Sequence, residues 1–261
     1  MRNAMKNPLV SVVIPAYNCA STIATAIDSA RNQDVPVEII VINDGSGDDL
    51  DGVMEQFRSV PEVVYVHNHT NLGAARTRNA GVALAKGEYV AFLDGDDYWA
   101  PHKLQKQLDA MEKTGAVLCA TGREMMTPEG KLTGRVIPVK EKITYRELLK
   151  HNSINCSSVL LRTSVAREFP MEHDDSHEDY IMWLRVLKKY ESACVVNEPL
   201  LKYRLSTTGK SGNKLKSARM TYRVYRYLGF GFMKSCMLFV SYGFHGVKKY
   251  ALSYLGVRNE A

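Results

Sequence analysis

The first 120 residues alternate short apolar runs with segments of helical spacing, and this alternation limits the fold more than any other feature of the chain. Strands that are apolar on both faces occur in parallel sheets, because helices cover such sheets on both sides. The pattern therefore predicts an α/β fold with a Rossmann-like, mostly parallel sheet and helices on both faces. The expected strands are 9–14, 37–42, 63–66, 89–93 and 116–120, and the expected helices are 21–33, 53–57, 74–85 and 101–113.

Polar loops follow three of these strands, at residues 15–18, 43–46 and 94–97. Ligands of an open parallel sheet bind beyond the carboxyl ends of its strands, so the loops are predicted to form a ligand site at one edge. Residues 123–146 look irregular because they contain several Pro and Gly residues. Residues 145–203 are expected to build the opposite wall of the cleft.

The third of these loops contains three carboxylates, Asp94, Asp96 and Asp97. Carboxylates that lie close together at the end of a buried strand repel one another unless a cation or hydrogen bonds compensate. Mg²⁺ and Mn²⁺ accept oxygen ligands of this kind and complete their coordination with substrate phosphates and water. The loop therefore indicates a divalent-metal site, and a solvated acidic turn is the alternative.

A second acidic pair, Glu178 and Asp179, precedes an amphipathic run at 181–187 that predicts a helix. Acids at a helix N-terminus often only compensate the helix dipole. A carboxylate in this place can also act as the general base that removes a proton from an attacking hydroxyl. Carboxylates of the first motif would then bind a cation that neutralises a diphosphate leaving group, while a carboxylate of the second motif activates the attacking hydroxyl.

Five blocks of sequence, in this order, resemble the inverting family-2 glycosyltransferases, which have a GT-A fold. The blocks are VSVVIPAYN (10–18), NDGS (43–46), NLGAARTRNAG (71–81), FLDGDDYW (92–99) and HEDY (177–180). Further blocks at 143–150, 152–159 and 202–206 are similar to the branch that makes teichuronic acid and capsule polysaccharides. The resemblance implies a metal-dependent hexosyltransferase that moves a sugar from a UDP-sugar to a hydroxyl of a lipid-linked saccharide acceptor.

The resemblance also implies a role for individual donor-site residues. Pro15, Tyr17 and Asp44 would surround the uridine, with Asp44 at the uracil edge. Arg78 would face the nucleotide, unless it is an ordinary surface cation of its helix.

Mg²⁺ or Mn²⁺ would be held mainly by Asp96, with Asp94 supporting the ribose or the waters of the metal. Some relatives carry a ribose-binding acid where this chain has Gly95. Asp97 is predicted to start a helix rather than to bind the ion. Asp179 is the predicted catalytic base and Glu178 the reserve candidate.

Two cations are candidates for neutralising the diphosphate, Arg204 and Lys210. Many relatives have a histidine where this chain has Ser206, which disfavours a histidine ligand to the metal. Lys210 lies in a Ser/Thr/Gly-rich stretch at 206–213 that is predicted to be a flexible loop able to close over the donor. The alternative for both cations is surface charge. Trp99 and Trp183 are expected to pack in the core rather than to stack on a sugar.

Positive charge is concentrated at the end of the chain. Residues 202–261 contain 12 Lys/Arg and one acid, net +11, whereas the preceding part has 22 basic and 27 acidic residues, net −5. Lys216, Arg219, Arg223 and Arg226 fall on one face of a predicted helix, and Met220, Val224, Tyr227 and Leu228 fall on another. This basic amphipathic tail is expected to lie on an anionic inner-leaflet surface, burying Met220, Val224, Phe230, Phe232 and Phe239.

The tail is not expected to cross a membrane, because its longest stretch without a charge is 13 residues, 235–247, where about 20 apolar residues are needed. The alternative is a helical pair that packs on the main domain or forms a homodimer. The predicted division is thus a GT-A domain at 1–205, with a nucleotide half at 1–120 and an acceptor half at 121–205, followed by the loop and tail at 206–261.

Five scattered cysteines and the lack of a signal-peptide pattern predict a protein of the cytoplasm, peripherally attached to the cytoplasmic face of the membrane. Two other functions remain as alternatives. A sugar-phosphate nucleotidyltransferase would need a Gly-rich triphosphate loop after the first strand, and residues 15–18 do not provide one. A non-enzymatic polyanion-binding protein would use the basic tail, but no nucleic-acid-binding motif accompanies it, so nucleic acid is not an expected partner.

Overall fold

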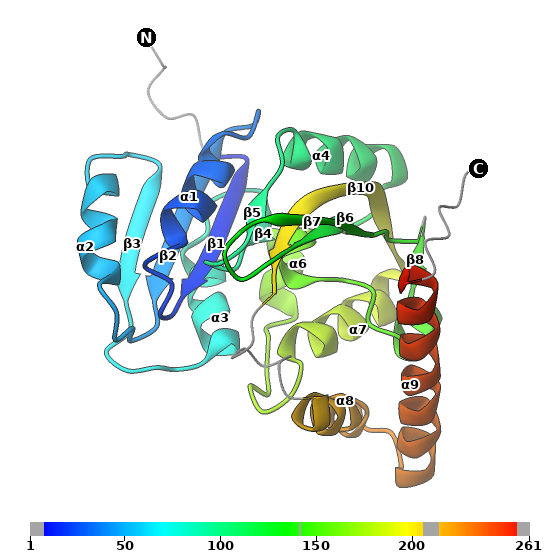
Figure 1. Ribbon diagram of the computed structural model, residues 1–261. Helices are drawn as coiled ribbons and strands as arrows, with labels where there is room; N and C mark the ends of the chain where they lie inside the picture. Colours follow the sequence, from blue (N-terminus) through cyan, green and yellow to red (C-terminus); the bar gives the residue numbers. More distant parts are fainter. Residues whose placement is uncertain (1–7, 141, 206–213, 255–261) are drawn as a thin grey trace.

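A ten-stranded sheet runs through the protein, with helices on both faces and two helices at the end of the chain (Figure 1). The computed structural model describes residues 8–140, 142–205 and 214–254. The strands of its main path lie in the order β3-β2-β1-β4-β9-β6-β10-β5, with β7 paired to β6 and β8 paired to β10. This arrangement confirms the predicted α/β class.

The first four strands of the sheet are parallel to one another, as predicted. They are β1 (Val10–Ala16), β2 (Val37–Asn43), β3 (Val63–His67) and β4 (Tyr89–Phe92), and every pairing among them is parallel. All four strands therefore end at the same edge.

The second half makes the sheet mixed. Strand β9 (Leu160–Arg162) pairs antiparallel with both β4 and β6 (Leu118–Met126). Strand β10 (Ser192–Arg204) runs parallel to β6 but antiparallel to β5 (Tyr98–Trp99) and β8 (Ile143–Thr144). The sheet, predicted to be mostly parallel, is thus parallel among β1–β4 and in the β6–β10 pair.

Two hydrophobic cores lie on opposite faces of the sheet, because neighbouring residues of each strand point to opposite sides. Val12 and Ile14 belong to one core, and Val13 belongs to the other. The first core includes residues of α1 (Ile23–Arg31), α2 (Leu50–Met54), the short helix Glu55–Phe57 and α4 (Lys103–Thr114). The second includes residues of α3 (Ala74–Leu84), α5 (Tyr145–Lys150), the short helix Cys156–Ser158, α6 (Thr163–Glu168) and α7 (Glu178–Tyr190).

The prediction of an irregular stretch at 123–146 was wrong. Strand β6 continues to Met126, and β7 (Leu132–Ile137) folds back on it as a hairpin. The turn is closed by the Thr127 N–H, which donates to the Lys131 carbonyl, and Gly130 supplies its positive φ of 90°. Because β7 lies largely exposed beside β6, it does not need the apolar run by which a buried strand is recognised.

The tail forms α8 (Lys214–Tyr227) and α9 (Phe232–Tyr254). Met220 and Val224 are 3% and 0% exposed, and Tyr225 beside them is fully buried. The expectation that Met220 and Val224 would enter a membrane was therefore wrong, since they face the protein. An amphipathic pattern shows that one face of a helix is buried, but it does not identify the surface that covers it.

Lys103 is buried without a carboxylate partner among the described residues. Its side chain is 0% exposed, its Nζ donates to Gln107 Oε1 at 2.7 Å, and the same Nζ lies 4.0 Å from the ring centre of Trp99. Trp99 and Trp183 are both buried in the core, as predicted. Burial lowers the pKa of Lys103 to about 7. Between pH 7 and about 10 the unfolded chain therefore binds more protons at this site, so the folded state gains stability as pH rises.

Lys103→Met should remove this pH dependence while keeping a side chain of similar length. From pH 7 to pH 9, we expect the free energy of unfolding of wild type to rise by roughly 1–2 kcal/mol more than that of the variant. Urea unfolding at the two pH values measures the difference. Lys106→Met, on the same helix at a partly exposed position, is the control and should follow wild type. A Lys103→Met curve parallel to wild type would contradict the assignment.

Candidate active site

The loops after β1 and β2 are bonded to each other at the carboxyl edge of the sheet. The Asn18 N–H donates to Ser46 Oγ at 3.1 Å, and the Gly47 N–H donates to Asn18 Oδ1 at 2.8 Å. Pro15, next to the last residue of β1, is partly exposed, and Tyr17, just after this strand, is 53% exposed. The structure thus leaves the Tyr17 ring open to a ligand at the edge where the sequence predicts the uridine.

Asp44 follows β2 and is almost fully buried. Its carboxylate accepts hydrogen bonds from Asn68 Nδ2 at 2.8 Å and from the N–H groups of Leu72 and Gly73 at 2.9 and 3.0 Å. Asp44 therefore fixes the loop that leads into α3. A carboxylate has about four acceptor positions, so one remains for a donor such as a uracil N–H.

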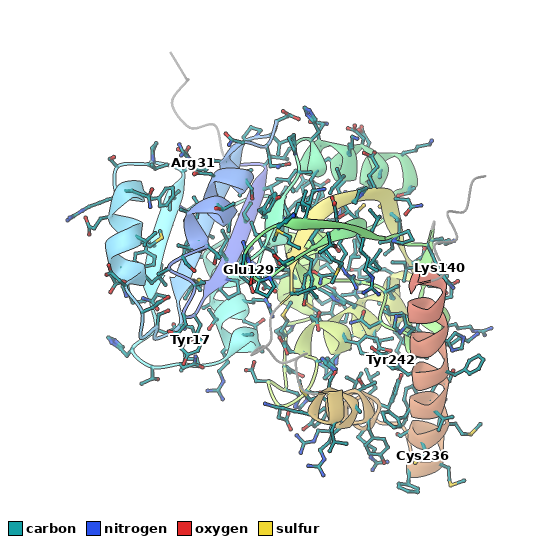
Figure 2. All side chains as sticks on the ribbon, in the orientation of Figure 1. Tyr17, Arg31, Glu129, Lys140, Cys236 and Tyr242 are labelled. Carbon is teal, nitrogen blue, oxygen red and sulfur yellow. The ribbon has the colours of Figure 1, made fainter. Side chains whose placement is uncertain are left out.

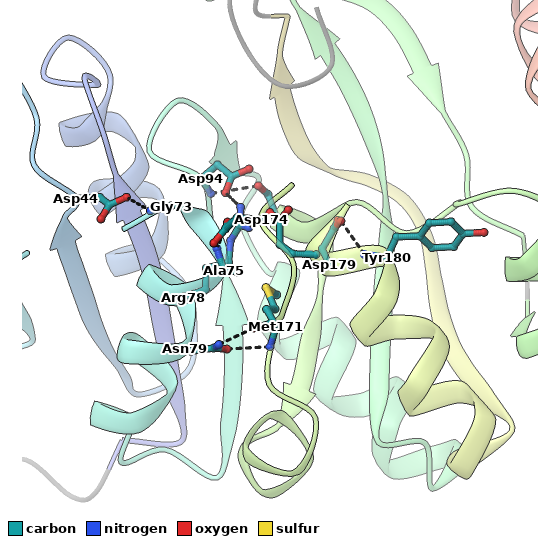
Figure 3. A network of polar contacts seen from close by, with 12 residues as sticks. Asp44, Gly73, Ala75, Arg78, Asn79, Asp94, Met171, Asp174, Asp179 and Tyr180 are labelled. Carbon is teal, nitrogen blue, oxygen red and sulfur yellow. Dashed lines mark hydrogen bonds and ion pairs between the residues drawn. The ribbon is translucent and has the colours of Figure 1, made fainter. Parts of the chain in front are cut away.

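Arg78 joins the two acidic motifs (Figure 3). It is 6% exposed, and its guanidinium donates from Nη2 to Asp94 Oδ1 at 2.6 Å and from Nη1 to Glu178 Oε1 at 2.9 Å. These carboxylates are 84 positions apart in the sequence, so the ion pairs connect α3 to the loop after β4 and to the start of α7. Arg78 is committed to the two carboxylates and is not the solvent-facing cation of its helix.

The acidic loop after β4 is held from two sides. The Asp94 N–H donates to Ser157 Oγ at 3.1 Å, and Asp97 Oδ1 accepts from the Arg204 N–H at 2.9 Å. Asp97 is 2% exposed and precedes β5 rather than a helix, so the prediction that it begins a helix was wrong. Its buried carboxyl instead ties the loop to β10.

Asp94 and Asp96 are the carboxylates of this loop that remain partly exposed. Burial, and then the negative charge of Asp94, raise the pKa of Asp96 to about 6. A Cβ atom added at Gly95 would lie 2.7 Å from the Sγ of Cys19. A side chain at position 95 would therefore require the Cys19 thiol to move.

Arg204 lies directly beside the acidic loop. Its Nε donates to the Asp96 carbonyl at 2.8 Å, and its Nη1 donates to the Pro128 carbonyl in the β6–β7 turn at 2.8 Å. The structure therefore brings the predicted cation Arg204 next to the carboxylate loop after β4. Lys210, the other predicted cation, lies outside the described residues.

The two acids at the start of α7 differ in their surroundings. Glu178 is 5% exposed and ion-paired with Arg78. Asp179 is partly exposed and accepts a hydrogen bond from the Tyr180 N–H at 2.7 Å, with no ion pair among the described side chains. Burial, and then the charge of Glu178, raise the pKa of Asp179. Asp179 is therefore better suited than Glu178 to accept a proton.

Sequence reasoning missed Asp174 and Ser157. Asp174 Oδ1 accepts from the Ala75 N–H at 2.8 Å, at the N-terminus of α3, from 99 positions away (Figure 3). Ser157 supports Asp94, and its carbonyl accepts from the Trp99 indole N–H at 2.7 Å. Ser157 lies inside the block 152–159 that resembles the family, which was the available signal. Asp174 lies outside the blocks that resemble the family, and only its position five residues before Asp179 in the sequence could have indicated it.

Within residues 8–140, 142–205 and 214–254, no group of three or more His, Cys, Asp or Glu side chains could by itself hold a metal ion. Asp94 and Asp96, two nearby and partly exposed carboxylates of the loop after β4, could still contribute ligands to a metal ion. This donor set fits Mg²⁺ or Mn²⁺, which use one or two protein carboxylates when phosphates and water supply the other ligands.

The sequence matches a family model and the sequences of known proteins. A family model described as glycosyl transferase family 2 matches residues 11–168. A protein of Bacillus subtilis (strain 168) named as the teichuronic acid biosynthesis glycosyltransferase TuaG is 36% identical over 245 residues, which cover 93% of this chain and 97% of the relative. The UDP-Glc:alpha-D-GlcNAc-diphosphoundecaprenol beta-1,3-glucosyltransferase WfaP of Escherichia coli is 32% identical over 252 residues, covering 96% and 99% of the two chains.

Among solved structures, the S. aureus TarS fragment 1–349 in complex with UDP-GlcNAc superposes with a TM-score of 0.72. The match covers 96% of this chain and 76% of the other, at 18% sequence identity. At this identity the likeness shows a shared fold.

Proposed function

The chain belongs to glycosyl transferase family 2, and on that premise we propose that it is a metal-dependent inverting enzyme using a UDP-sugar donor. The acceptor in this proposal is a hydroxyl of a lipid-linked saccharide in cell-surface polysaccharide biosynthesis. The observation that carries the proposal is the Arg78 bridge, which holds Asp94 and the Glu178–Asp179 pair at one site. The names of the B. subtilis and E. coli relatives support the acceptor class.

In the proposed donor site, Tyr17 lies against the uracil ring and Pro15 lines the floor. Asp44 accepts the uracil N–H with its remaining lone pair while it fixes the loop before α3. Arg78 contributes indirectly, because it orients Asp94 rather than contacting the nucleotide.

Asp96 would hold the divalent cation, with Asp94 orienting its waters or the ribose. When bound, the cation stabilises the negative charge that develops on the departing diphosphate. Arg204 adds a second positive charge beside the same loop. The pKa of Asp96, raised to about 6, still leaves its carboxylate mostly ionised at neutral pH.

Asp179 is the proposed general base. The acceptor oxygen forms a bond to the anomeric carbon as the bond from that carbon to the diphosphate oxygen breaks, and the hydroxyl proton passes to Asp179. UDP leaves with the bonding electrons, and the single displacement inverts the anomeric carbon. Glu178 keeps Arg78 in place and does not take the proton.

The alternative enzyme, a sugar-phosphate nucleotidyltransferase, is less well supported. Residues 15–18 contain no glycine and hold Tyr17 at the edge where a Gly-rich triphosphate loop would be required. Thermal shift with UDP-sugars, UDP, CTP and GTP, each with and without Mn²⁺, tests the donor class. The proposal expects Mn²⁺-dependent stabilisation by UDP compounds. Stabilisation by triphosphates alone would favour the alternative.

The tail carries an apolar stripe that suits a membrane surface. Met233, Met237, Val240 and Phe244 of α9 are 72, 70, 70 and 69% exposed and recur at helical spacing on one face. None of the helices in the described part of the chain is both long and apolar enough to cross a membrane. In Figures 1 and 2, Tyr17, α8 and the Cys236 end of α9 all lie in the lower part of the molecule.

In this proposal, the stripe of α9 lies in the interface of an anionic inner leaflet, together with exposed basic residues such as Arg226 of α8 and Lys234 of α9. The enzyme would then act at the cytoplasmic face, close to its lipid-linked acceptor. Each cation near such a surface contributes about 1 kcal/mol. The other possible occupant of the stripe is a second copy of the chain.

Vesicle flotation should show binding to phosphatidylserine-containing vesicles at low salt and weaker binding at high salt. Met237→Glu combined with Val240→Glu should lower binding by about tenfold at either salt concentration, because both exposed apolar side chains are lost. Tyr17→Ala, which leaves the tail unchanged, is the control. If wild type stays unbound under both conditions and sediments as a dimer, the stripe is an interface between subunits.

A further inference from the structure

The residues that carry the proposed base are held from two sides. This base segment, residues 171–179, is bonded on one side to α3. Asn79 exchanges two hydrogen bonds with the backbone of Met171, at 2.7 and 2.9 Å, and Asp174 accepts from the Ala75 N–H. These contacts, drawn in Figure 3, attach the base segment to the nucleotide half of the protein.

Helix α8 of the tail holds the other side of the base segment. Ser176 is fully buried, and its Oγ donates to the Met220 carbonyl at 2.9 Å. His177, the residue before α7, has Nε2 at 3.3 Å from the Ser217 carbonyl. Both contacts use backbone carbonyls of α8, so they depend on where the helix lies.

Two side chains of α8 add contacts at the middle of the base segment. Arg223 Nη1 donates to Asp175 Oδ2 at 2.8 Å, and the Tyr227 hydroxyl donates to the same oxygen at 2.7 Å. The Tyr227 ring also stacks on His173, with centroids 3.7 Å apart and an interplanar angle of 2°. His173 has a positive φ of 66°, a conformation that needs support from its surroundings.

Helix α8 is itself fixed to the protein rather than loosely attached. Met220, Val224 and Tyr225 are buried, and the Tyr225 hydroxyl donates to the Leu149 carbonyl at 2.8 Å. Tyr180, the residue after Asp179, donates to the adjacent Leu148 carbonyl at 2.6 Å. Helices α5, α7 and α8 therefore form one packed unit around the base.

We propose that α8 is a positioning element of the active site, which holds the base segment and thereby the carboxylate of Asp179. Ser176, Arg223 and Tyr227 are positioning residues that act through this segment. The proposal rests on the proposed function, since it assigns α8 a part in the transfer step. It also gives the tail a role that does not require a membrane.

The test measures kcat and the donor KM of the full chain with a UDP-sugar and a water-soluble saccharide acceptor, without vesicles. Ser176→Ala and Tyr227→Ala should each lower kcat by about tenfold and leave the donor KM within about twofold of wild type. The reason is that a small displacement of a reacting group strongly slows the chemical step. Tyr227→Phe keeps the stacking on His173 and should recover part of the loss.

Arg223→Ala and Arg219→Ala form a matched pair. Both remove one positive charge from α8, but Arg219 makes no hydrogen bond or ion pair with the base segment in the described structure. Arg223→Ala should lower kcat about threefold, and Arg219→Ala should behave like wild type. Equal effects of the two variants, or wild-type kcat in folded Ser176→Ala and Tyr227→Ala, would overturn the proposal.

Hydrogen exchange at the amides of Ser176 and Ile181 provides a readout that is independent of turnover. Their N–H groups donate to the carbonyls of His173 and His177. Tyr227→Ala should accelerate exchange at both amides while exchange at β1 stays unchanged. Unaltered exchange in Tyr227→Ala would overturn the positioning role of α8, whether or not the wild-type enzyme transfers sugar. Absence of sugar transfer by wild type would contradict only the proposed function.

Discussion

Asp96→Ala is expected to lower kcat by at least about 10²-fold and to abolish the effect of Mn²⁺ on UDP affinity. The cation supplies several kcal/mol of charge stabilisation to a departing diphosphate, and Asp96 is its main proposed protein ligand. Transfer assays and UDP titrations with Mn²⁺ or a chelator measure the two effects. Asp94→Ala should be less severe, because Asp94 is shared with Arg78.

Asp97→Asn is the matched control for Asp96→Ala. The change keeps an oxygen that can accept the Arg204 N–H and removes a neighbouring carboxyl of the same loop. This variant should retain metal-dependent UDP binding. Near-normal turnover together with metal-dependent UDP affinity in the Asp96→Ala enzyme would show that the metal is assigned to the wrong residue.

Asp179→Asn is expected to lower kcat by about 10² or more while the donor KM stays close to wild type. The substitution keeps the shape of the side chain and removes its basicity. The raised pKa of Asp179 also predicts that wild-type kcat falls as pH drops through that pKa, because a protonated carboxyl cannot accept the acceptor proton. The variant should lose the part of this acidic limb that comes from Asp179.

Glu178→Gln distinguishes the two acids at the start of α7. It should disturb the Arg78 bridge and so change donor affinity as well as kcat, without removing the acidic limb. Normal kcat in Asp179→Asn, combined with a collapse of kcat and loss of the acidic limb in Glu178→Gln, would assign the base to Glu178 instead.

The parallel half of the fold and its loops were predictable because their signals are local. Strands such as β1 and β2 are apolar on both faces, and the polar loops containing Asp44 and Asp96 follow directly in sequence. The antiparallel strand β9 has three residues, and β7 is largely exposed, so neither has a periodic pattern of useful length. Their pairing depends on contacts with distant strands.

The partners of the site residues were less predictable than the residues themselves. A motif places Arg78 near the edge of the sheet, but its distance from Glu178 is set by the packing of α3 against residues 171–180. Asp174 meets Ala75 for the same reason. The charge of the tail was visible in the sequence, whereas burial of Met220 and Val224 under the protein depends on the surface that α5 and α7 present.

The most direct test of the proposed function is transfer from a panel of UDP-sugars to a synthetic N-acetylglucosamine-diphospho-lipid, followed by NMR assignment of the new anomeric centre. We expect Mn²⁺- or Mg²⁺-dependent formation of a disaccharide, with release of UDP and an anomeric configuration opposite to that of the donor. A product with retained configuration, or transfer that is unaffected by removal of divalent metal, would contradict the proposed function.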